Sequence, residues 1–311
     1  MLKFKKINLV ILLMAIGSVS IAQQRSIQER LGYPKDTKLL IIHADDIGVS
    51  HSENMASIYV MEKGVVTSGS IMVPCPWLPE IAEYAKSHPD ADLGLHLTLT
   101  SEWKNYKWGP VAPSDKVPSL LDDMGYLPNS TLTVMKNAKP GEVELEYRAQ
   151  IERALKFGIK PTHFDTHMAS ASCTPEILKI YIKLSHEYKV PVLISQELGN
   201  LFKFKITDYT TENDIVIARS VMATYDDYKF GMENFYTKQI KAMTSGLNVI
   251  LLHAAYSDAE MKAVTDGHND YGANWRQDDV DFFTSEKCRK LLADEKIKLI
   301  TWKEIRDKLF R

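Results

Sequence analysis

The sequence is poor in cysteine and has no excess of positive charge. Three cysteines in 311 residues are too few for a disulfide scaffold. Thirty-eight basic side chains against 40 acidic ones leave a net charge of −2, which excludes the basic field that nucleic-acid binding needs. With only 15 glycines and 13 prolines, the chain is neither collagen-like nor mostly disordered. After residue 22 no apolar run is long enough to cross a membrane. The sequence therefore predicts a globular protein that binds no nucleic acid.

Residues 1–22 have the composition of a secretory signal peptide. Three lysines precede an apolar run over residues 9–16, and small residues follow up to Ala22. A positive start, a short apolar centre and small residues before cleavage are typical of export signals. We therefore expect cleavage after Ala22, one mature domain over residues 23–311, and a periplasmic or extracellular location. In that oxidising environment the three cysteines can form at most one disulfide. We expect them to be small buried residues rather than reactive thiols.

Segments typical of buried strands alternate with segments typical of helices. An aliphatic run over residues 39–46 is followed by a capping-box pattern at Ser50 and Glu53 and by a helix closed at Gly64. Seven or eight such β-α units predict an α/β fold with a parallel sheet and helices outside. At this length we expect a single-domain (β/α) barrel, closed or distorted, with seven or eight strands. An open doubly wound sheet is the alternative, and no glycine-rich dinucleotide motif follows the first strand.

The expected elements cover most of the chain, with irregular stretches over residues 101–140, 196–212 and 255–278. Expected strands lie at 39–46, 65–73, 93–99, 162–168, 191–195, 215–220, 249–254 and 298–301. Expected helices lie at 51–63, 78–87, 142–157, 175–188, 228–243, 280–294 and 303–310.

Ionisable side chains collect toward the ends of four expected strands. They are Asp45 and Asp46 in the first strand, His96 in the third, His163, Asp165 and His167 in the fourth, and His253 at the end of a later one. In a barrel the C-terminal ends of the strands form one mouth, so we expect these groups to converge there. This convergence indicates function more strongly than any of the residues alone.

The segment over residues 163–167 places three polar side chains on one face of a strand, because side chains alternate between faces. A buried charge on that face is costly unless it is paired or bound to metal. We expect His167, nearest the mouth, to be a metal ligand, with Asp165 or His163 supporting it. A hydrogen-bonded polar core is the alternative, and a direct ligand role for His163 stays open. His96 gains weight as a ligand from Gly94 beside it and from its place at a strand end.

The pair Asp45-Asp46 allows two arrangements. Neighbours in a strand point to opposite faces, which weakens the carboxylate pairing that glycoside hydrolysis uses. At a strand end the backbone can turn, so that one acid holds a metal while the other faces substrate. His43 and His51 flank this element as further candidates. His253 suits a proton donor because imidazole titrates near neutral pH.

Four motifs in order carry a family resemblance. They are His-Ala-Asp-Asp-Ile-Gly at 43–48, Val-Thr-Ser at 66–68, Gly-Leu-His-Leu at 94–97 and Pro-Thr-His-Phe-Asp-Thr-His at 161–167. Their order and spacing resemble the YdjC-like carbohydrate deacetylase family from about residue 38 to 170, and the second half resembles it more loosely. The chain departs from the family pattern at Ile47, where relatives commonly have phenylalanine, and at 168–170, where relatives carry further histidines.

The resemblance implies a metal-dependent hydrolase that removes acetyl groups from N-acetylated amino sugars or oligosaccharides. The implied roles are metal ligands at Asp46, His96 and His167, a general base at Asp45, an acid at His253 and an orienting residue at Asp165. Zinc suits two histidines and a carboxylate, and the family also allows magnesium as the one divalent ion. Two alternatives are another metal-dependent hydrolase acting on an amide, ester or phosphate, and a non-catalytic glycan-binding protein. The sugar and the oligomeric state stay open.

Aromatic residues are frequent in the irregular segments near expected strand ends. They are Trp103, Tyr106, Trp108, Tyr126, Tyr271 and Trp275. Sugar rings have apolar faces that pack on aromatic rings, so a glycan platform and ordinary loop packing are equally good interpretations. The basic residues among them, Lys104, Lys107 and Arg276, are equally well interpreted as solvated charges.

Overall fold

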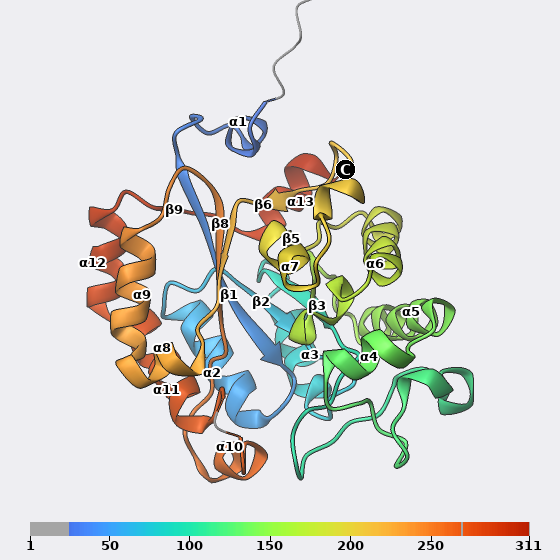
Figure 1. Cartoon of the computed structure of the whole chain (residues 1–311). Helices are drawn as coiled ribbons and strands as arrows, with labels where there is room; N and C mark the ends of the chain where they lie inside the picture. The colour runs from blue at the N-terminus through green and yellow to red at the C-terminus, as the bar shows by residue number, and fades with distance from the viewer. Residues whose placement is uncertain (1–24, 269, 311) are drawn as a thin grey trace, which may run out of the picture.

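The computed structural model describes residues 25–268 and 270–310, so the expected signal peptide lies outside the described residues. Its centre is a seven-stranded parallel sheet in the order β4-β3-β2-β1-β8-β7, with β9 also paired to β1 (Figure 1). The strands are β1 (Lys38–Ile47), β2 (Ser68–Ile71), β3 (Leu93–Leu97), β4 (Phe164–Thr166), β7 (Arg219–Val221), β8 (Gly246–Leu252) and β9 (Lys298–Leu299).

A smaller two-stranded sheet continues beyond β4. It pairs β5 (Ile194–Ser195) with β6 (Val216–Ile217), again in parallel. An isolated parallel bridge joins Phe164 of β4 to Val192, just before β5. Past β6, the Ala218 N–H donates to the Leu247 carbonyl of β8. The fold is thus a single α/β domain with a half-barrel sheet, consistent with a distorted barrel and without the continuous strand pairing of a closed one.

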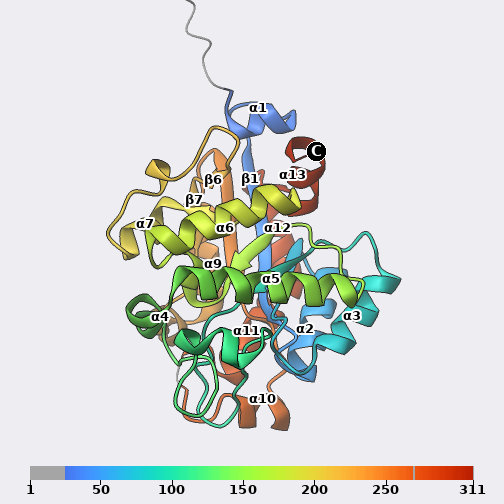
Figure 2. The same ribbon diagram turned by 90° about the vertical axis from the view of Figure 1, so that its right-hand side faces the viewer.

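Helices cover the outside of the sheet, and α5 and α6 cross in front of it in Figure 2. The helices are α1 (Ile27–Leu31), α2 (His51–Glu62), α3 (Leu78–Ser87), α4 (Thr131–Asn137), α5 (Pro140–Lys156), α6 (Pro175–Tyr188), α7 (Gln196–Leu201), α8 (Tyr225–Phe230), α9 (Met232–Lys241), α10 (Ala259–Val264), α11 (Ala273–Thr284), α12 (Glu286–Asp294) and α13 (Trp302–Leu309). No helix in the described part of the chain has the length and apolarity needed to cross a bilayer.

Two of the helices expected from sequence are each divided in two. The expected helix over 228–243 breaks at Gly231, whose φ of 96° is incompatible with a continuous helix. The expected helix over 280–294 breaks at Ser285, which has extended backbone and accepts a hydrogen bond from the Cys288 N–H to cap α12. In both cases a local capping preference overrides the apolar periodicity.

β1 runs through the middle of the core. Every residue of this strand after Lys38 is buried, which explains the unbroken apolar run in its sequence. The three cysteines, Cys75, Cys173 and Cys288, are buried and unbridged. In Figure 1 the C-terminal end of β1 points toward the part of the molecule that holds α10 and the irregular segment preceding α4.

Gly94 lets the His163 imidazole pack against the backbone of β3. A Cβ at this position would lie 2.4 Å from His163 Nε2, too close for any real contact. We expect Gly94→Ala to lower the free energy of unfolding by about 1–3 kcal/mol, the usual cost of overpacking a core. Denaturant titration measures the change. Gly141→Ala is the control, because a Cβ there meets nothing within 4 Å; equal stability of the two variants would contradict the packing described.

Candidate active site

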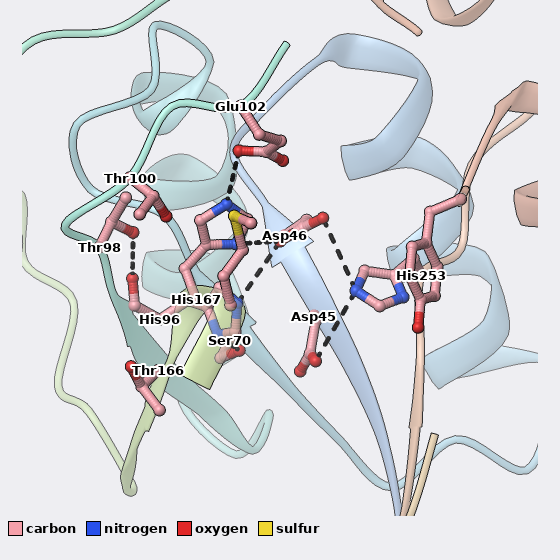
Figure 3. Close-up of polar contacts among 12 residues, drawn as sticks. Asp45, Asp46, Ser70, His96, Thr98, Thr100, Glu102, Thr166, His167 and His253 are labelled. Atoms are coloured by element: carbon pink, nitrogen blue, oxygen red, sulfur yellow. Dashed lines mark hydrogen bonds and ion pairs between the residues drawn. The ribbon is translucent and has the colours of Figure 1, made fainter. Parts of the chain in front are cut away.

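Three side chains from three strands face one another at the C-terminal end of the sheet (Figure 3). Asp46 comes from the end of β1, His96 from β3, and His167 directly follows β4. Asp46 Oδ1 lies 3.2 Å from His167 Nδ1 and 3.5 Å from His96 Nε2. One ligand atom from each of the three residues lies within 4.8 Å of the others, close enough to share one metal ion. The structure therefore brings together the three residues named as ligands from the sequence.

The backbone turns at Asp46, and this turn lets two adjacent acids share one cavity. Asp46 has a φ of 63°, which a non-glycine residue rarely adopts. The pairing of β1 with β2 changes register between Ala44 and Ile47. As a result Asp45 and Asp46 both line the cavity instead of facing opposite sides of the sheet. Backbone strain of this kind is concentrated at functional sites.

Asp46 has one carboxylate oxygen without a hydrogen-bond partner. Its Oδ2 accepts a hydrogen bond from Arg276 Nη2 at 3.0 Å. Its Oδ1 is buried and accepts no hydrogen bond from any described residue, although it faces two imidazole nitrogens. A buried acceptor without a partner is costly, and a cation would satisfy it. One oxygen and two nitrogens form a donor set that fits a divalent ion, with zinc favoured by the imidazoles.

Two other groups of side chains in the described residues are also close enough to hold an ion. One consists of His43, His163 and Asp165 and the other of Asp45, His96 and Asp165. In the first group only Asp165 lines the cavity, and neither of its two imidazoles does. The second group lines the cavity but offers a single imidazole with two carboxylates. The group with Asp46 is the one that brings two imidazoles and a carboxylate together with all three side chains lining the cavity.

A carboxylate lies beside the second nitrogen of each of these two imidazoles. Asp165 Oδ1 lies 2.9 Å from His96 Nδ1, and Glu102 Oε2 lies 2.9 Å from His167 Nε2. Such pairs fix the orientation of ligand imidazoles and raise their basicity. Burial alone lowers the pKa of His167, but the charges of Glu102 and Asp46 outweigh burial and raise it to about 10. Sequence reasoning found Asp165 and missed Glu102, which lies in an irregular loop without any motif.

Arg276 is not a solvated charge, contrary to that interpretation of the sequence. It is 1% exposed, pairs with Asp46 and Glu53, and lies against the Trp103 ring at 5.1 Å. Burial raises the pKa of Asp46, but the charges of His253, which is protonated in the acid range where Asp46 titrates, and of His167 and Arg276 outweigh it and hold the pKa well below its usual range. No pattern in the sequence signals this pairing, which joins α11 to the end of β1.

Asp45 and His253 face each other across the same cavity. His253 Nε2 lies 3.9 Å from Asp45 Oδ2 and 3.8 Å from Asp46 Oδ2. The His253 ring packs on Tyr271 with 4.4 Å between ring centres. Burial lowers the pKa of His253 to about 4, so its imidazole is neutral in the resting site. It can therefore donate a proton only after it has received one.

His43 connects Asp45 to Asp165. Its Nε2 lies 3.2 Å from Asp45 Oδ1 and 2.9 Å from Asp165 Oδ2. Burial lowers the pKa of His43, but the two carboxylates outweigh burial and raise it to about 10. His51, the other flanking candidate, is half exposed and pairs with Glu80 instead. His163 stacks on Trp302 with 5.3 Å between ring centres.

The cavity beside these residues has a volume of about 360 Å³. The acids and imidazoles already described form the polar part of its lining. The apolar part of the lining consists of Met168, Leu193, Leu198, Leu201, Met222 and Leu251. Trp103 and Tyr271, two of the aromatic residues noted in the sequence, also line the cavity. The site thus combines polar groups with the apolar lining common in small-molecule pockets.

Asp279 accepts a hydrogen bond from the backbone of His253. We expect its carboxyl to make the free energy of unfolding depend on pH. Its Oδ2 accepts from the His253 N–H, and burial raises the pKa of its carboxyl to about 7. Between about pH 4 and 7 the Asp279 carboxyl keeps its proton in the folded protein and has lost it in the unfolded chain. The contribution of Asp279 to the free energy of unfolding therefore falls as the pH rises, by at most about 1.4 kcal/mol per pH unit. We expect Asp279→Asn to show a shallower fall in unfolding free energy over this range. Denaturant titrations at several pH values test this, and equal slopes in both proteins would contradict it.

Comparisons with known proteins agree with one another. The family model for YdjC-like protein matches residues 39–294. A carbohydrate deacetylase of Thermus thermophilus is 30% identical over 292 residues, 91% of this chain and 98% of the relative. A carbohydrate deacetylase of Brevibacillus brevis is 31% identical over 274 residues, 86% of this chain and 99% of the relative.

A solved structure shares the fold. It is a crystal structure from Enterococcus faecalis, provisionally named a cellobiose-phosphate cleavage protein, with a TM-score of 0.71 and 24% identity over 86% of this chain and 99% of the other. The family match extends well past residue 170, so the second half belongs to the family as well as the first, despite its looser motifs. The chain is a member of the YdjC-like family.

Proposed function

We propose that the protein is a metal-dependent carbohydrate deacetylase that hydrolyses the N-acetyl group of amino sugars or oligosaccharides. One observation carries the proposal: Asp46 Oδ1, which accepts no hydrogen bond from the described residues, faces two imidazoles in a cavity that also holds Asp45 and His253. The relatives named carbohydrate deacetylases supply the substrate class. Export to the periplasm or outside the cell is part of the proposal and depends on residues 1–22.

Asp46, His96 and His167 would hold the divalent ion. Such an ion supplies positive charge that polarises the amide carbonyl and acidifies water. Arg276 keeps Oδ2 of Asp46 engaged and so directs Oδ1 toward the imidazoles. Two histidines and one carboxylate leave positions open for water and substrate, as a catalytic site requires.

Asp45 is the general base in this scheme. The His43 imidazole lies against its Oδ1, which leaves Oδ2 directed toward His253 and the cavity. From this position Asp45 accepts a proton from the attacking water. Its fixed orientation limits the reorganisation needed as the proton moves.

His253 protonates the departing nitrogen. An amide nitrogen is a poor leaving group as an anion, so it must gain a proton as the C–N bond breaks. Because the resting imidazole is neutral, His253 first receives a proton, and Asp45 Oδ2 at 3.9 Å is the nearest carboxylate that gains one during the reaction. Tyr271 packs on the ring and keeps it in the cavity.

Acetate release from a panel of N-acetylglucosamine and its oligomers tests the function. We expect the zinc-loaded protein to release one acetate for each amine formed, and a chelator to abolish the release reversibly. Turnover of ester or phosphate substrates without acetate from any sugar would favour a different hydrolase. Sugar binding without any product would favour a glycan-binding protein.

A further inference from the structure

A second pocket lies beside the catalytic cavity. Its volume is about 300 Å³, within the range of small-ligand sites. It lies between α8, α10 and the start of α11, which are near one another in Figure 1. Its lining consists of Tyr225, Tyr228, Lys262, Thr265, His268, Gly272, Ala273, Asn274 and Trp275. His268 also lines the catalytic cavity, so the two hollows adjoin.

A row of neighbouring rings runs from His253 in the catalytic cavity to this pocket. Tyr271 lies 4.4 Å from the His253 ring and 4.4 Å from the Trp275 ring, measured between ring centres. Trp275 in turn stacks on Tyr228 at 4.9 Å and an interplanar angle of 4°. Tyr225, at 6.4 Å from Tyr228, ends the row and is 39% exposed. Trp275 is 1% exposed and covered on both faces, so it supports Tyr228 from behind, and Tyr225 is the ring that is open to a ligand.

Two of the side chains that line the pocket offer hydrogen-bond donors. The Lys262 ammonium also adds a positive charge. Asn274 Oδ1 accepts from Ser257, which leaves its amide NH₂ as the free end. No carboxylate is among the lining residues that the structure describes. An exposed tyrosine ring beside a basic and an amide donor matches a pyranose ring that bears hydroxyl and acetamido oxygens, because such a ring offers an apolar face and acceptors around its edge.

We propose that this pocket is a subsite for a second sugar ring of an N-acetylated oligosaccharide whose reacting unit lies in the catalytic cavity. The proposal rests on the proposed function and adds chain-length selectivity to it. Because the two hollows adjoin at His268, the occupant we propose is one chain that reaches both. Tyr225 supplies the exposed ring. Lys229 Nζ lies over one face of this ring, 4.8 Å from its centre, so the other face is the one for the sugar.

The test compares N-acetylglucosamine with its trimer as substrates for the parent, Tyr225→Ala and Tyr225→Phe. We expect Tyr225→Ala to raise KM for the trimer about tenfold, the effect of one lost aromatic contact, and to leave kcat/KM for the monosaccharide unchanged. Tyr225→Phe keeps the ring and should behave like the parent. An equal effect on both substrates, or no effect on the trimer, would overturn the subsite.

Isothermal titration calorimetry tests the sugar subsite independently of the deacetylase activity. Trimer is titrated into Asp45→Asn, with and without Tyr225→Ala, so that binding is measured without turnover. If the parent releases no acetate, but the trimer binds and loses affinity with Tyr225→Ala, the pocket stands and the deacetylase assignment fails. If the trimer does not bind, or binds equally with and without Tyr225, the subsite fails whatever the activity.

Discussion

The protein in which both His96 and His167 are replaced by alanine is expected to lose its divalent ion and its activity together. The two side chains supply two of the three proposed ligand atoms, each within 3.5 Å of Asp46 Oδ1. Removing a side chain that hydrogen-bonds to a metal ligand typically lowers metal affinity 10–100-fold. Removing two of the ligands themselves should therefore lower the affinity more than about 100-fold. Metal analysis after dialysis and a competitive chelator titration measure the loss.

The matched control replaces two histidines that lie away from the cavity. His51 and His88 have half-exposed side chains, so His51→Ala with His88→Ala removes the same number of imidazoles. This protein should keep one ion per chain and its activity. Full metal content in the His96, His167 double variant would refute the ligand assignment.

Asp45→Asn is expected to reduce kcat by about 10²–10⁴-fold, the usual contribution of a general base. The amide keeps the shape of the side chain but cannot take a proton from water. Because Asp45 is not one of the three proposed ligands, metal content should stay near one ion per chain. Steady-state kinetics of acetate release, read beside metal analysis of the same sample, check both parts of the prediction.

Asp115→Asn is the control for this variant, since Asp115 is 72% exposed and belongs to the irregular segment after β3. It should have parental kcat and metal content. If Asp45→Asn kept more than about a tenth of the parental kcat, the base would have to be another group. If it lost the ion as well, Asp45 would belong to the metal site.

Much of the fold follows from sequence because long elements carry clear local signals. α3 and α6 have the predicted bounds, Leu78–Ser87 and Pro175–Tyr188, and both begin with proline in their first turn. Short elements were not predicted: α7 and α10 lie in segments expected to be irregular. A helix of six residues shows less than two turns of periodicity, so its existence depends on tertiary contacts.

The site was predictable where residues lie on strands or directly follow them, and not where they lie in distant loops or helices. The strand-end rule and the family motifs named Asp45, Asp46, His96, His167 and His253, and all five line the cavity. Glu102 and Arg276 complete the site from a loop and from α11. Their distance in sequence from Asp46 and His167 leaves no spacing pattern, so folding is needed to reveal them.

Anomalous diffraction from crystals of the zinc-loaded protein, recorded on both sides of the zinc edge, tests the central claim most directly. We predict one strong peak per chain, bonded to Asp46 Oδ1, His96 Nε2 and His167 Nδ1. No peak at this position, or a peak bonded to His43 and His163 instead, would contradict the account.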